Sequence, residues 1–417
     1  MNYKKTKAMI VAGVMSGTSA DGVDVAICRI SPGNEAIARV KVLYHRATPY
    51  PAQLRRAVLS AMDAKCMSVD GLARLSWRLG EVYAKAVEVA ARESGVRPQL
   101  VACHGQTLYH QGLASKYLGA PVRCTWQIGE ASMIVERMGV PVVSDFRPAD
   151  LAAGGQGAPL VPMFDFCVYR DTRKSRILLN LGGIANVTVL PAGCAAEDVL
   201  AFDTGPANMV IDGCMNHVYG RGFDAGGRVA GRGSVMVRVV DRFAAGGYFS
   251  SPPPKSCGRE EFGEAFVARF IAACEREGAG KEDVIASATA LTAKTIAGAY
   301  IRFCEPCLKQ SAKQNAKQNA KQRAEHAKRD AAVAASIELI AAGGGVRNRT
   351  LMQMLGEEFA ALHVRVHTSE DTGLAAGAKE AAAFALLGWL TWHGLPGNLP
   401  SATGAKRAVV LGKVSLA

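Results

Sequence analysis

Small, hydroxylated and acidic residues interrupt the first apolar stretch of the chain. The runs "MIVAGVM" and "VDVAICRI" are typical of β-strands, and the seven residues Ser16–Gly22 connect them. A plain hairpin needs two to five connecting residues, so this longer turn is suited to holding a ligand. Its glycines let a phosphate approach the backbone, and its hydroxyls and amides can donate hydrogen bonds to phosphate oxygens. Because Asp21 and Asp24 would repel a bare phosphate, we expect Mg²⁺ between them; an ordinary Asx turn is the alternative.

A second candidate group lies in "AFDTGPANMVID", where we expect a strand to end and a helix to begin. Pro206 fits the first turn of such a helix, because its missing N–H is not needed there. Asp203 or Thr204 would then be the helix N-cap. A carboxylate at the mouth of a cleft is equally suited to act as a general base. The spacing of these residues leaves both interpretations open.

Two further segments carry groups suited to substrate binding. Arg147 can bind a carboxylate in a bidentate manner, and the alternative is an ion pair with Asp150. His104 ends an expected strand, where it would either bind a substrate or be a satisfied core histidine. Its neighbour Cys103 would point to the opposite face, so the two cannot form a nucleophile–base pair. The turn Gly343–Gly345 lacks the G-x-G-x-x-G fingerprint of dinucleotide-binding proteins. It would either pass beneath the base or sugar of a nucleotide or simply be a tight turn.

Strands and helices alternate around these segments, and the pattern starts twice. The second start is "RILLNLGGIANVTVL", in which two expected strands again flank a glycine turn, Gly182-Gly183. We therefore expect two related α/β domains that face one another across a cleft. The N-terminal domain, residues 1–150, would carry the phosphate-binding hairpin. The C-terminal domain, residues 151–417, would carry Asp203 and the glycine turn at residues 343–345.

Composition narrows the class of protein. The 417 residues are 49% hydrophobic and 20% charged, as in soluble globular proteins, and no apolar run approaches the ~20 residues of a membrane span. The lysines ahead of "AMIVAGVM" imitate a secretory signal, but this apolar core is short and runs into a second strand. Eleven scattered cysteines do not form a disulfide framework. We expect a cytoplasmic protein without a membrane partner.

One segment supplies almost half of the net charge of +13. Lys309–Arg329 contains seven basic residues, a single acidic residue and the repeat "AKQNAKQNAKQR". The repeat has no apolar face to bury, so we expect a solvated polar insertion at about residues 309–330. No aromatic residue is interleaved for base stacking, and we therefore expect no nucleic-acid partner. A polyanion-binding arm is the alternative, and the oligomeric state stays open, with a homodimer as one alternative.

Taken together, the ordered segments resemble one family, the anhydro-N-acetylmuramic acid kinases. Each segment alone is weak evidence for this resemblance, but the ordered set of segments is specific to the family. Ala20 and Ala207 stand where the family more often has Leu and Gly, and the AKQN insertion is peculiar to this sequence. The matching segments, between residues 13 and 348, are "GVMSGTSADGVDVA", "CHGQTLYH", "DFRPADLAAGGQGAPLVP", "NLGGIAN", "FDTGPAN", "PPPKSCGREEF" and "AAGGGVRN".

The resemblance implies a two-domain α/β fold of the sugar kinase/actin/hexokinase-like (ribonuclease H-like) type, with a central ATP cleft. It also implies an enzyme that depends on ATP and Mg²⁺. The enzyme would open the 1,6-anhydro ring of 1,6-anhydro-N-acetylmuramic acid and phosphorylate it to N-acetylmuramic acid 6-phosphate. This reaction belongs to peptidoglycan recycling and amino-sugar catabolism. A related sugar kinase that phosphorylates a free hydroxyl is the alternative.

The same resemblance implies roles for individual residues. Asp203 would be the base that activates water, and Arg147 would hold the lactyl carboxylate of the substrate. His104, Asp150 and Glu380 would lie near the sugar. Asp21 is the expected ligand of Mg²⁺. The residues expected to bind ATP are Gly17, Thr18, Ser19, Ala20, Asp21, Gly22, Val23, Asp24, Gly182, Gly183, Gly343, Gly344, Gly345 and Asn348.

Overall fold

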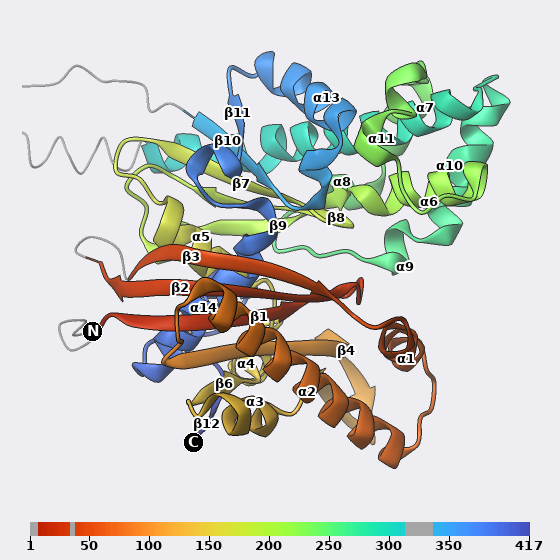
Figure 1. Ribbon diagram of the computed structural model, residues 1–417. Helices are drawn as coiled ribbons and strands as arrows, with labels where there is room; N and C mark the ends of the chain where they lie inside the picture. The colour runs from red at the N-terminus through yellow and green to blue at the C-terminus, as the bar shows by residue number, and fades with distance from the viewer. Residues whose placement is uncertain (1–6, 34–37, 313–336) are drawn as a thin grey trace, which may run out of the picture. The chain divides into compact units, whose positions relative to one another are not determined.

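The computed structural model describes residues 7–33, 38–312 and 337–417 (Figure 1). The chain forms two compact units. The first consists of the residues up to Val168 together with Gly377–Ala417, and the second is Tyr169–Ala376. Residues 313–336, which include most of the AKQN repeat and most of the expected insertion, lie outside the described residues.

A seven-stranded mixed sheet forms the centre of the first unit, in the order β12-β6-β4-β1-β2-β3, with β5 paired to β4. Neighbours β1, β2 and β3 are antiparallel, whereas β4 is parallel to both β1 and β6. Strand β1, the apolar stretch that imitates a secretory signal, therefore lies inside this sheet. The strands are β1 (Met9–Ser16), β2 (Gly22–Pro32), β3 (Ala38–Pro49), β4 (Leu100–Tyr117), β5 (Ala120–Ile128), β6 (Val142–Ser144) and β12 (Lys413–Ser415).

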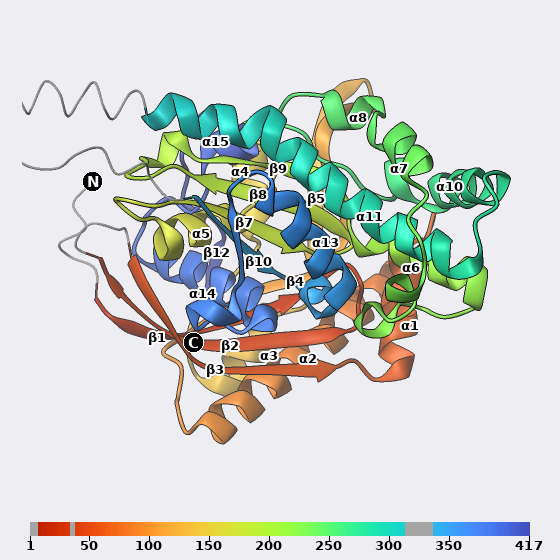
Figure 2. The same ribbon diagram turned by 90° about the horizontal axis from the view of Figure 1, so that it is seen from above.

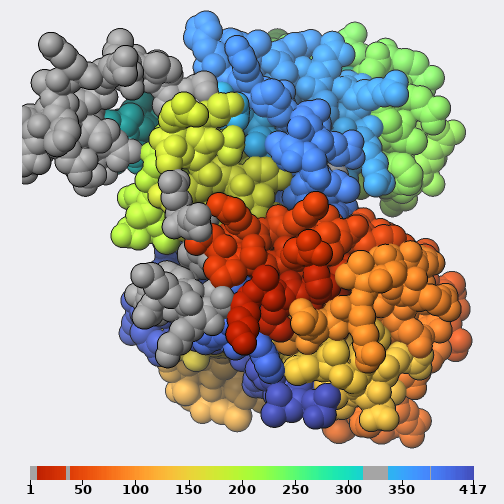
Figure 3. All heavy atoms as spheres, turned by 60° about the vertical axis from the view of Figure 1, so that its left-hand side comes forward, coloured from red at the N-terminus to blue at the C-terminus, as the bar shows by residue number. Residues whose placement is uncertain are grey.

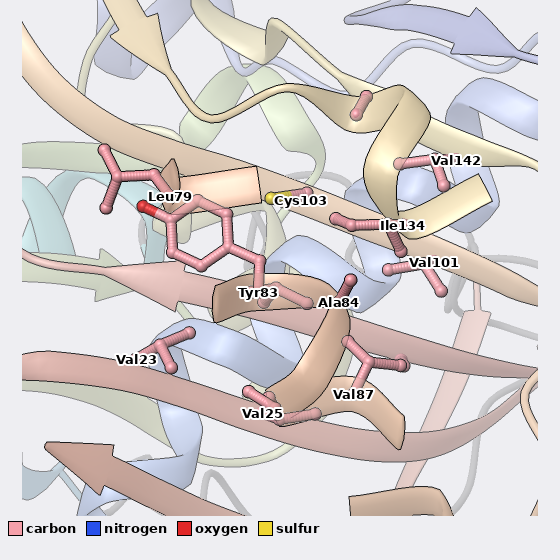
Figure 4. Packing of buried hydrophobic residues seen from close by; sticks show 14 of the residues in the cluster. Val23, Val25, Leu79, Tyr83, Ala84, Val87, Val101, Cys103, Ile134 and Val142 are labelled. Carbon is pink, nitrogen blue, oxygen red and sulfur yellow. The ribbon is translucent and has the colours of Figure 1, made fainter. Parts of the chain in front are cut away.

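Helices cover both faces of this sheet. Side chains alternate along β1, so Ala12 and Val14 lie in one buried core with the apolar residues of α2 and α3. Figure 4 shows part of this core around Tyr83. Gly13 faces the other way, where a Cβ would lie 1.8 Å from Ala381 O of α14. Ser68 Oγ caps the start of α2. The helices are α1 (Ala52–Met62), α2 (Val69–Ser94), α3 (Ala131–Met138), α4 (Phe146–Ala152), α5 (Val161–Tyr169), α14 (Lys379–Trp392) and α15 (Pro400–Thr403).

The second unit repeats this topology in a five-stranded sheet of order β11-β10-β7-β8-β9. Neighbours β7, β8 and β9 are antiparallel, whereas β10 is parallel to both β7 and β11. Each sheet thus has three consecutive antiparallel strands, followed by parallel strands beside the first of them. This is the ribonuclease H-like order, and the expected fold class is confirmed. The strands are β7 (Ser175–Leu181), β8 (Ile184–Leu190), β9 (Leu200–Pro206), β10 (Ile337–Ala342) and β11 (Arg365–Thr368).

Helix α11 runs through the second unit beside α6, α7, α10 and α13 (Figure 2). Helix α11 is the first part of a continuous helix, Lys281–Ala312, that is long and apolar enough to cross a membrane. Because 78% of its most apolar stretch is buried inside the protein, it is a core helix. Gly263 separates the short helix α9 from α10. The helices are α6 (Asn208–Tyr219), α7 (Val237–Ala244), α8 (Gly247–Ser250), α9 (Arg259–Phe262), α10 (Glu264–Arg276), α11 (Lys281–Ala299) and α13 (Arg349–Ala360), with a π-helix at Tyr300–Cys304.

The two compact units differ from the sequence-based division at residue 150, because residues 151–168 and the C-terminal segment both belong to the first unit. Helix α14 is buried on nearly all sides, so it needs an apolar partner over most of its surface. The face of the first sheet that includes Gly13 supplies that partner. Figure 3 shows the dark blue C-terminal residues beside the orange and yellow residues of the same unit.

Candidate active site

The turn between β1 and β2 is held in place by buried polar side chains. Ser16 Oγ lies 2.9 Å from Gly22 O and 2.7 Å from Gln106 Oε1. Gln106 Nε2 donates to Gly17 O at 3.1 Å, and Tyr50 OH donates to Ser16 Oγ at 2.8 Å. Sequence reasoning missed Gln106, although a glutamine within the buried start of a strand was a usable signal. These contacts fix the backbone that we expected to approach phosphate.

The outer side of the same turn is open. A Cβ at Gly17 would meet only Ser19 Oγ, at 3.9 Å. Thr18 and Ser19 are exposed, and Ala20 adopts a left-handed conformation with φ 51°. Gly22 serves another purpose, because a Cβ there would lie 2.2 Å from Thr48 O of β3. Within this turn, Gly17 therefore offers the open backbone that a phosphate requires.

The acidic residues of the turn already have partners in the protein. Asp21 Oδ1 accepts a hydrogen bond from exposed Arg55 at 3.0 Å. Asp24 Oδ1 lies 2.9 Å from His45 Nε2. Within the described ranges, no three His, Cys, Asp or Glu side chains are grouped so that they could hold a metal ion. Mg²⁺ at this turn would therefore depend mainly on phosphate oxygens, as is usual for this ion.

Arg147, near the start of α4, forms a polar cluster with His104 in the buried part of β4. Arg147 Nε donates to His104 Nε2 at 2.9 Å, and Arg147 Nη1 donates to Gly157 O at 2.8 Å. His104 Nδ1 lies 2.8 Å from Gly105 O, so we assign the neutral tautomer with its proton on Nδ1. Burial, with the Arg147 charge, lowers the pKa of His104 well below its usual value. Burial also lowers the pKa of Arg147 to about 10, so the guanidinium stays charged at neutral pH.

Asp150 is buried and fastens the loop that follows α4. Its Oδ2 accepts from Gly157 N at 2.8 Å, and its Oδ1 accepts from Asn398 Nδ2 at 2.6 Å and from Thr403 Oγ1 at 2.7 Å. The direct ion pair between Asp150 and Arg147, one of the two sequence-based alternatives, is not formed within the described part of the chain. Asp150 instead holds the loop whose Gly157 carbonyl binds Arg147.

Glu380 lies in the first turn of α14, in the same unit as Arg147. Burial raises the pKa of Glu380; the charge of Asp24 adds to this effect, while those of Lys379 and Arg147 oppose it. Lys379 Nζ forms a buried ion pair with Asp165 Oδ1 at 2.8 Å. The four expected sugar-binding residues, His104, Arg147, Asp150 and Glu380, are thus linked by direct contacts or by their charges.

Asp203 lies within β9 of the second unit, and a distant segment holds it. Its N–H donates to Lys255 O at 3.1 Å, and its carbonyl accepts from Tyr248 OH at 2.9 Å. Cys257 N–H donates to Asp203 Oδ2 at 3.0 Å. Asp203 Oδ1 has no hydrogen-bond partner among the described residues. Burial raises the pKa of Asp203 to about 6, against the opposing effects of the Cys257 amide and the Lys255 charge.

The helix-cap interpretation of Asp203 and Thr204 is wrong. Strand β9 continues to Pro206, and α6 begins only at Asn208, after Ala207, without a side-chain cap. Thr204 Oγ1 donates to Ala185 O instead. The first amides of α6 bind the carbonyls of Gly182 and Gly183, so the glycine turn takes the place of a cap.

The glycine turn at residues 343–345 lies against the end of β7, just before the turn Gly182-Gly183. A Cβ at Gly343, where φ is 90°, would lie 2.7 Å from Asn180 Oδ1, and a Cβ at Gly345 would lie 2.6 Å from Leu181 Cβ. Gly344, by contrast, faces open space. Asn348 caps α13, because its Oδ1 accepts from Leu351 N at 3.0 Å. Of these residues, Gly344 has the open surface that contact with a nucleotide needs.

The sequence matches one family of known proteins over nearly its whole length. The family model described as "Anhydro-N-acetylmuramic acid kinase" matches residues 9–310 and 319–417. The chain belongs to this family. An anhydro-N-acetylmuramic acid kinase from Salinibacter ruber is 42% identical over 410 residues, 97% of this chain and 96% of the relative. One from Caldanaerobacter subterraneus subsp. tengcongensis is 38% identical over 419 residues, 99% of this chain and 98% of the relative.

Among solved structures, component A of (R)-2-hydroxyglutaryl-CoA dehydratase from Acidaminococcus fermentans is similar to this chain, with a TM-score of 0.41 and 12% sequence identity. The similarity covers 91% of this chain and 98% of that chain.

Membership of the anhydro-N-acetylmuramic acid kinases confirms the expectation of an ATP-dependent amino-sugar kinase. The family match is interrupted at residues 311–318, where the AKQN repeat begins.

The open side of Gly17 leads to a prediction for this kinase. Gly17→Val should leave the fold intact, since the new side chain starts in open space, but it should obstruct a phosphate at the backbone. We expect the affinity for ATP to fall about tenfold or more, the equivalent of one charge-assisted hydrogen bond. Isothermal titration calorimetry measures this loss. Gly356→Val, at an equally open position in α13, is the control, and an unchanged ATP affinity of Gly17→Val would place the phosphates elsewhere.

Proposed function

We propose that this chain uses ATP to open the anhydro ring of 1,6-anhydro-N-acetylmuramic acid and to form N-acetylmuramic acid 6-phosphate, in peptidoglycan recycling. Family membership supports the substrate class. One observation carries the chemistry: Asp203 is held by Cys257 at Oδ2, while Oδ1 has no partner in the described part of the chain. A carboxylate that is fixed at one oxygen and open at the other is suited to act as a base.

Opening the ring requires a nucleophile at the anomeric carbon and an acceptor for the departing oxygen O6. Asp203 removes a proton from water. The water oxygen bonds to the anomeric carbon while the bond between the anomeric carbon and O6 breaks. O6 attacks the γ-phosphorus of ATP, whose bond to the β,γ-bridging oxygen breaks to release ADP. An ordinary glycosidase needs a second carboxylic acid to protonate the leaving oxygen. Here the phosphoryl group takes that place, so one carboxylate suffices.

Arg147 is proposed to bind the lactyl carboxylate of the substrate. Its Nη2 makes no hydrogen bond to the described residues, whereas Nε and Nη1 are held by His104 and Gly157. A guanidinium fixed in this way loses little freedom when it binds a carboxylate. His104 and Asp150 would act by orienting Arg147, directly and through the Gly157 loop. Glu380 is proposed to contact the sugar.

ATP binding is proposed for residues of both units, each on its own evidence. The open backbone at Gly17 fits a phosphate, and the exposed hydroxyls beside it supply further donors. The open position at Gly344 fits adenosine. Mg²⁺, held by phosphate oxygens with Asp21, would neutralise charge on the transferred group. The proposed ATP-binding set is otherwise unchanged: Gly17–Asp24, Gly182, Gly183, Gly343–Gly345 and Asn348.

The pH dependence of the reaction should report the ionisation of Asp203. A general base works only when deprotonated, so kcat/KM for the sugar should fall as the pH drops below about 6, the pKa to which burial raises Asp203. One pH unit below that value, activity should be about tenfold lower. Initial rates at saturating ATP across pH 4.5–8 measure this profile. Activity that is constant down to pH 4.5 would contradict a base with a raised pKa.

A coupled assay of ADP release tests the proposed substrate. The anhydro sugar should be turned over much faster than free N-acetylmuramic acid, because only the anhydro ring supplies O6 as a leaving group. A preference for the free sugar would favour the alternative, a kinase that phosphorylates an ordinary hydroxyl. We also propose a cytoplasmic location, since all eleven cysteines are free thiols and ATP is a substrate, and a homodimer as the assembly to be tested.

A further inference from the structure

Lys255 has an unusual environment for a lysine in a surface segment. Its Nζ lies 4.7 Å from the ring centroid of Tyr248, 4.9 Å from that of Phe303 and 5.8 Å from that of Phe202. The ammonium also donates to Tyr248 O at 3.0 Å and to Phe249 O at 3.4 Å. Three aromatic rings and two carbonyls therefore surround one cation and attract its charge, although burial lowers the pKa of Lys255. We call these three rings and Lys255 the lysine cage.

The segment that carries Lys255 holds Asp203 from two sides. The carbonyl of Lys255 accepts from Asp203 N, and the amide of Cys257, two residues later, donates to Asp203 Oδ2. Tyr248, a wall of the lysine cage, donates its hydroxyl to Asp203 O. Residues 251–258 are neither helical nor in a strand. The side chain of Lys255 is thus an anchor for a segment that has no regular structure of its own.

We infer that Lys255 is a positioning residue for the reaction: the lysine cage fixes the segment 251–258, and that segment orients the carboxylate of Asp203. This inference rests on the proposed function, in which Asp203 is the base. Lys255 itself contacts Asp203 only through its backbone carbonyl, so it acts through the segment and through its charge. Neither the sugar nor ATP needs to touch Lys255.

The charges around Asp203 give this role a measurable signature. The titratable groups that face Asp203 are Lys255, the Cys257 thiol and the Tyr248 hydroxyl. Burial raises the pKa of Cys257 to about 12, and it raises that of Tyr248 further, so both are neutral at pH 7. Lys255 is then the cation that opposes the effect of burial on Asp203. Arg302 faces Lys255, and Glu260 and Glu261 face Cys257 from α9.

Lys255→Met tests the inference, because methionine fills the cage without a charge or a hydrogen-bond donor. We expect kcat to fall about tenfold or more, the equivalent of one hydrogen bond to a charged group. The acid limb of the pH profile, where kcat/KM falls as Asp203 is protonated, should lie at a higher pH than in the wild-type enzyme. The reason is that the Lys255 charge, which favours ionised Asp203, is gone. KM for ATP should stay unchanged. Lys255→Arg, which keeps the charge, should keep the wild-type limb.

Control variants separate positioning from simple packing. Lys281→Met removes another ammonium beside a tyrosine ring, 5.8 Å from the centroid of Tyr219, without touching Asp203, and its pH profile should match wild type. A Lys255→Met enzyme with a lower melting temperature but an unmoved acid limb would overturn the inference. If that variant does not fold, Phe303→Leu, which opens one wall of the cage, should move the limb in the same direction, and an unmoved limb there would also overturn it.

One further variant distinguishes failure of this inference from failure of the proposed function. Asp203→Asn should be nearly inactive if Asp203 is the base. An active Asp203→Asn enzyme would contradict the base itself. An inactive Asp203→Asn enzyme together with a wild-type pH profile in Lys255→Met would contradict only the positioning role of Lys255.

Discussion

Turnover of the Asp203→Asn variant is expected to fall by about 10²–10⁴-fold, the usual contribution of a general base. Asparagine keeps the size of aspartate, and its carbonyl oxygen can still accept from Cys257 N–H. Its amide nitrogen cannot remove a proton from water at any pH. The affinity for ATP should change little, since the substitution leaves the backbone contacts of Asp203 with Lys255 and Tyr248 in place.

Following the products by NMR makes this prediction specific. Ring opening and phosphoryl transfer should fail together in the variant, because each depends on the other. In the wild-type enzyme the anomeric centre should be inverted, since water attacks opposite the departing oxygen. Asp212→Asn on α6 is the matched control: burial raises the pKa of Asp212 to about 7, yet no catalytic role is assigned to it. Near-normal formation of N-acetylmuramic acid 6-phosphate by Asp203→Asn would exclude Asp203 as the base.

Local sequence patterns predicted the elements that depend on local forces. Ser68 caps the start of α2, and Gly95, in the left-handed conformation, ends it. Both residue types are recognisable helix signals in a sequence. The repeated strand–turn–strand pattern predicted two related units, and the two sheets share one topology. The ribonuclease H-like identity of that topology came from the resemblance rather than from periodicity.

Contacts between distant parts of the chain explain what the sequence did not predict. The cap interpretation of Asp203 failed because β9 continues past it to Pro206. Its carboxylate instead accepts from Cys257 N–H, fifty-four residues further along the chain. Gln106 supports the phosphate turn from a separation of eighty-nine residues. The return of α14 to the first sheet depends on the small residue Gly13, whose importance appears only when a helix lies against it. No spacing rule relates such pairs.

Arg147→Lys is expected to raise KM for the anhydro sugar by about 10- to 100-fold, the range of a hydrogen bond between charged groups. Lysine keeps the positive charge, but it lacks the planar fork that binds a carboxylate in a bidentate manner. It also loses the bond to His104 Nε2 and the bond to Gly157 O that fix the guanidinium. KM for ATP should stay unchanged, because Arg147 is assigned to the sugar alone.

A sugar without the lactyl group decides whether Arg147 binds the carboxylate. Wild type should prefer 1,6-anhydro-N-acetylmuramic acid over 1,6-anhydro-N-acetylglucosamine, which lacks that group, and Arg147→Lys should lose most of the preference. Arg137→Lys, at a surface position of α3 that pairs with Glu88, should retain it. An equal loss of kcat/KM for both sugars in Arg147→Lys would mean that Arg147 only supports the fold around His104. A loss confined to the lactyl sugar would instead place the substrate carboxylate at the free edge of the guanidinium, where Nη2 has no partner among the described residues.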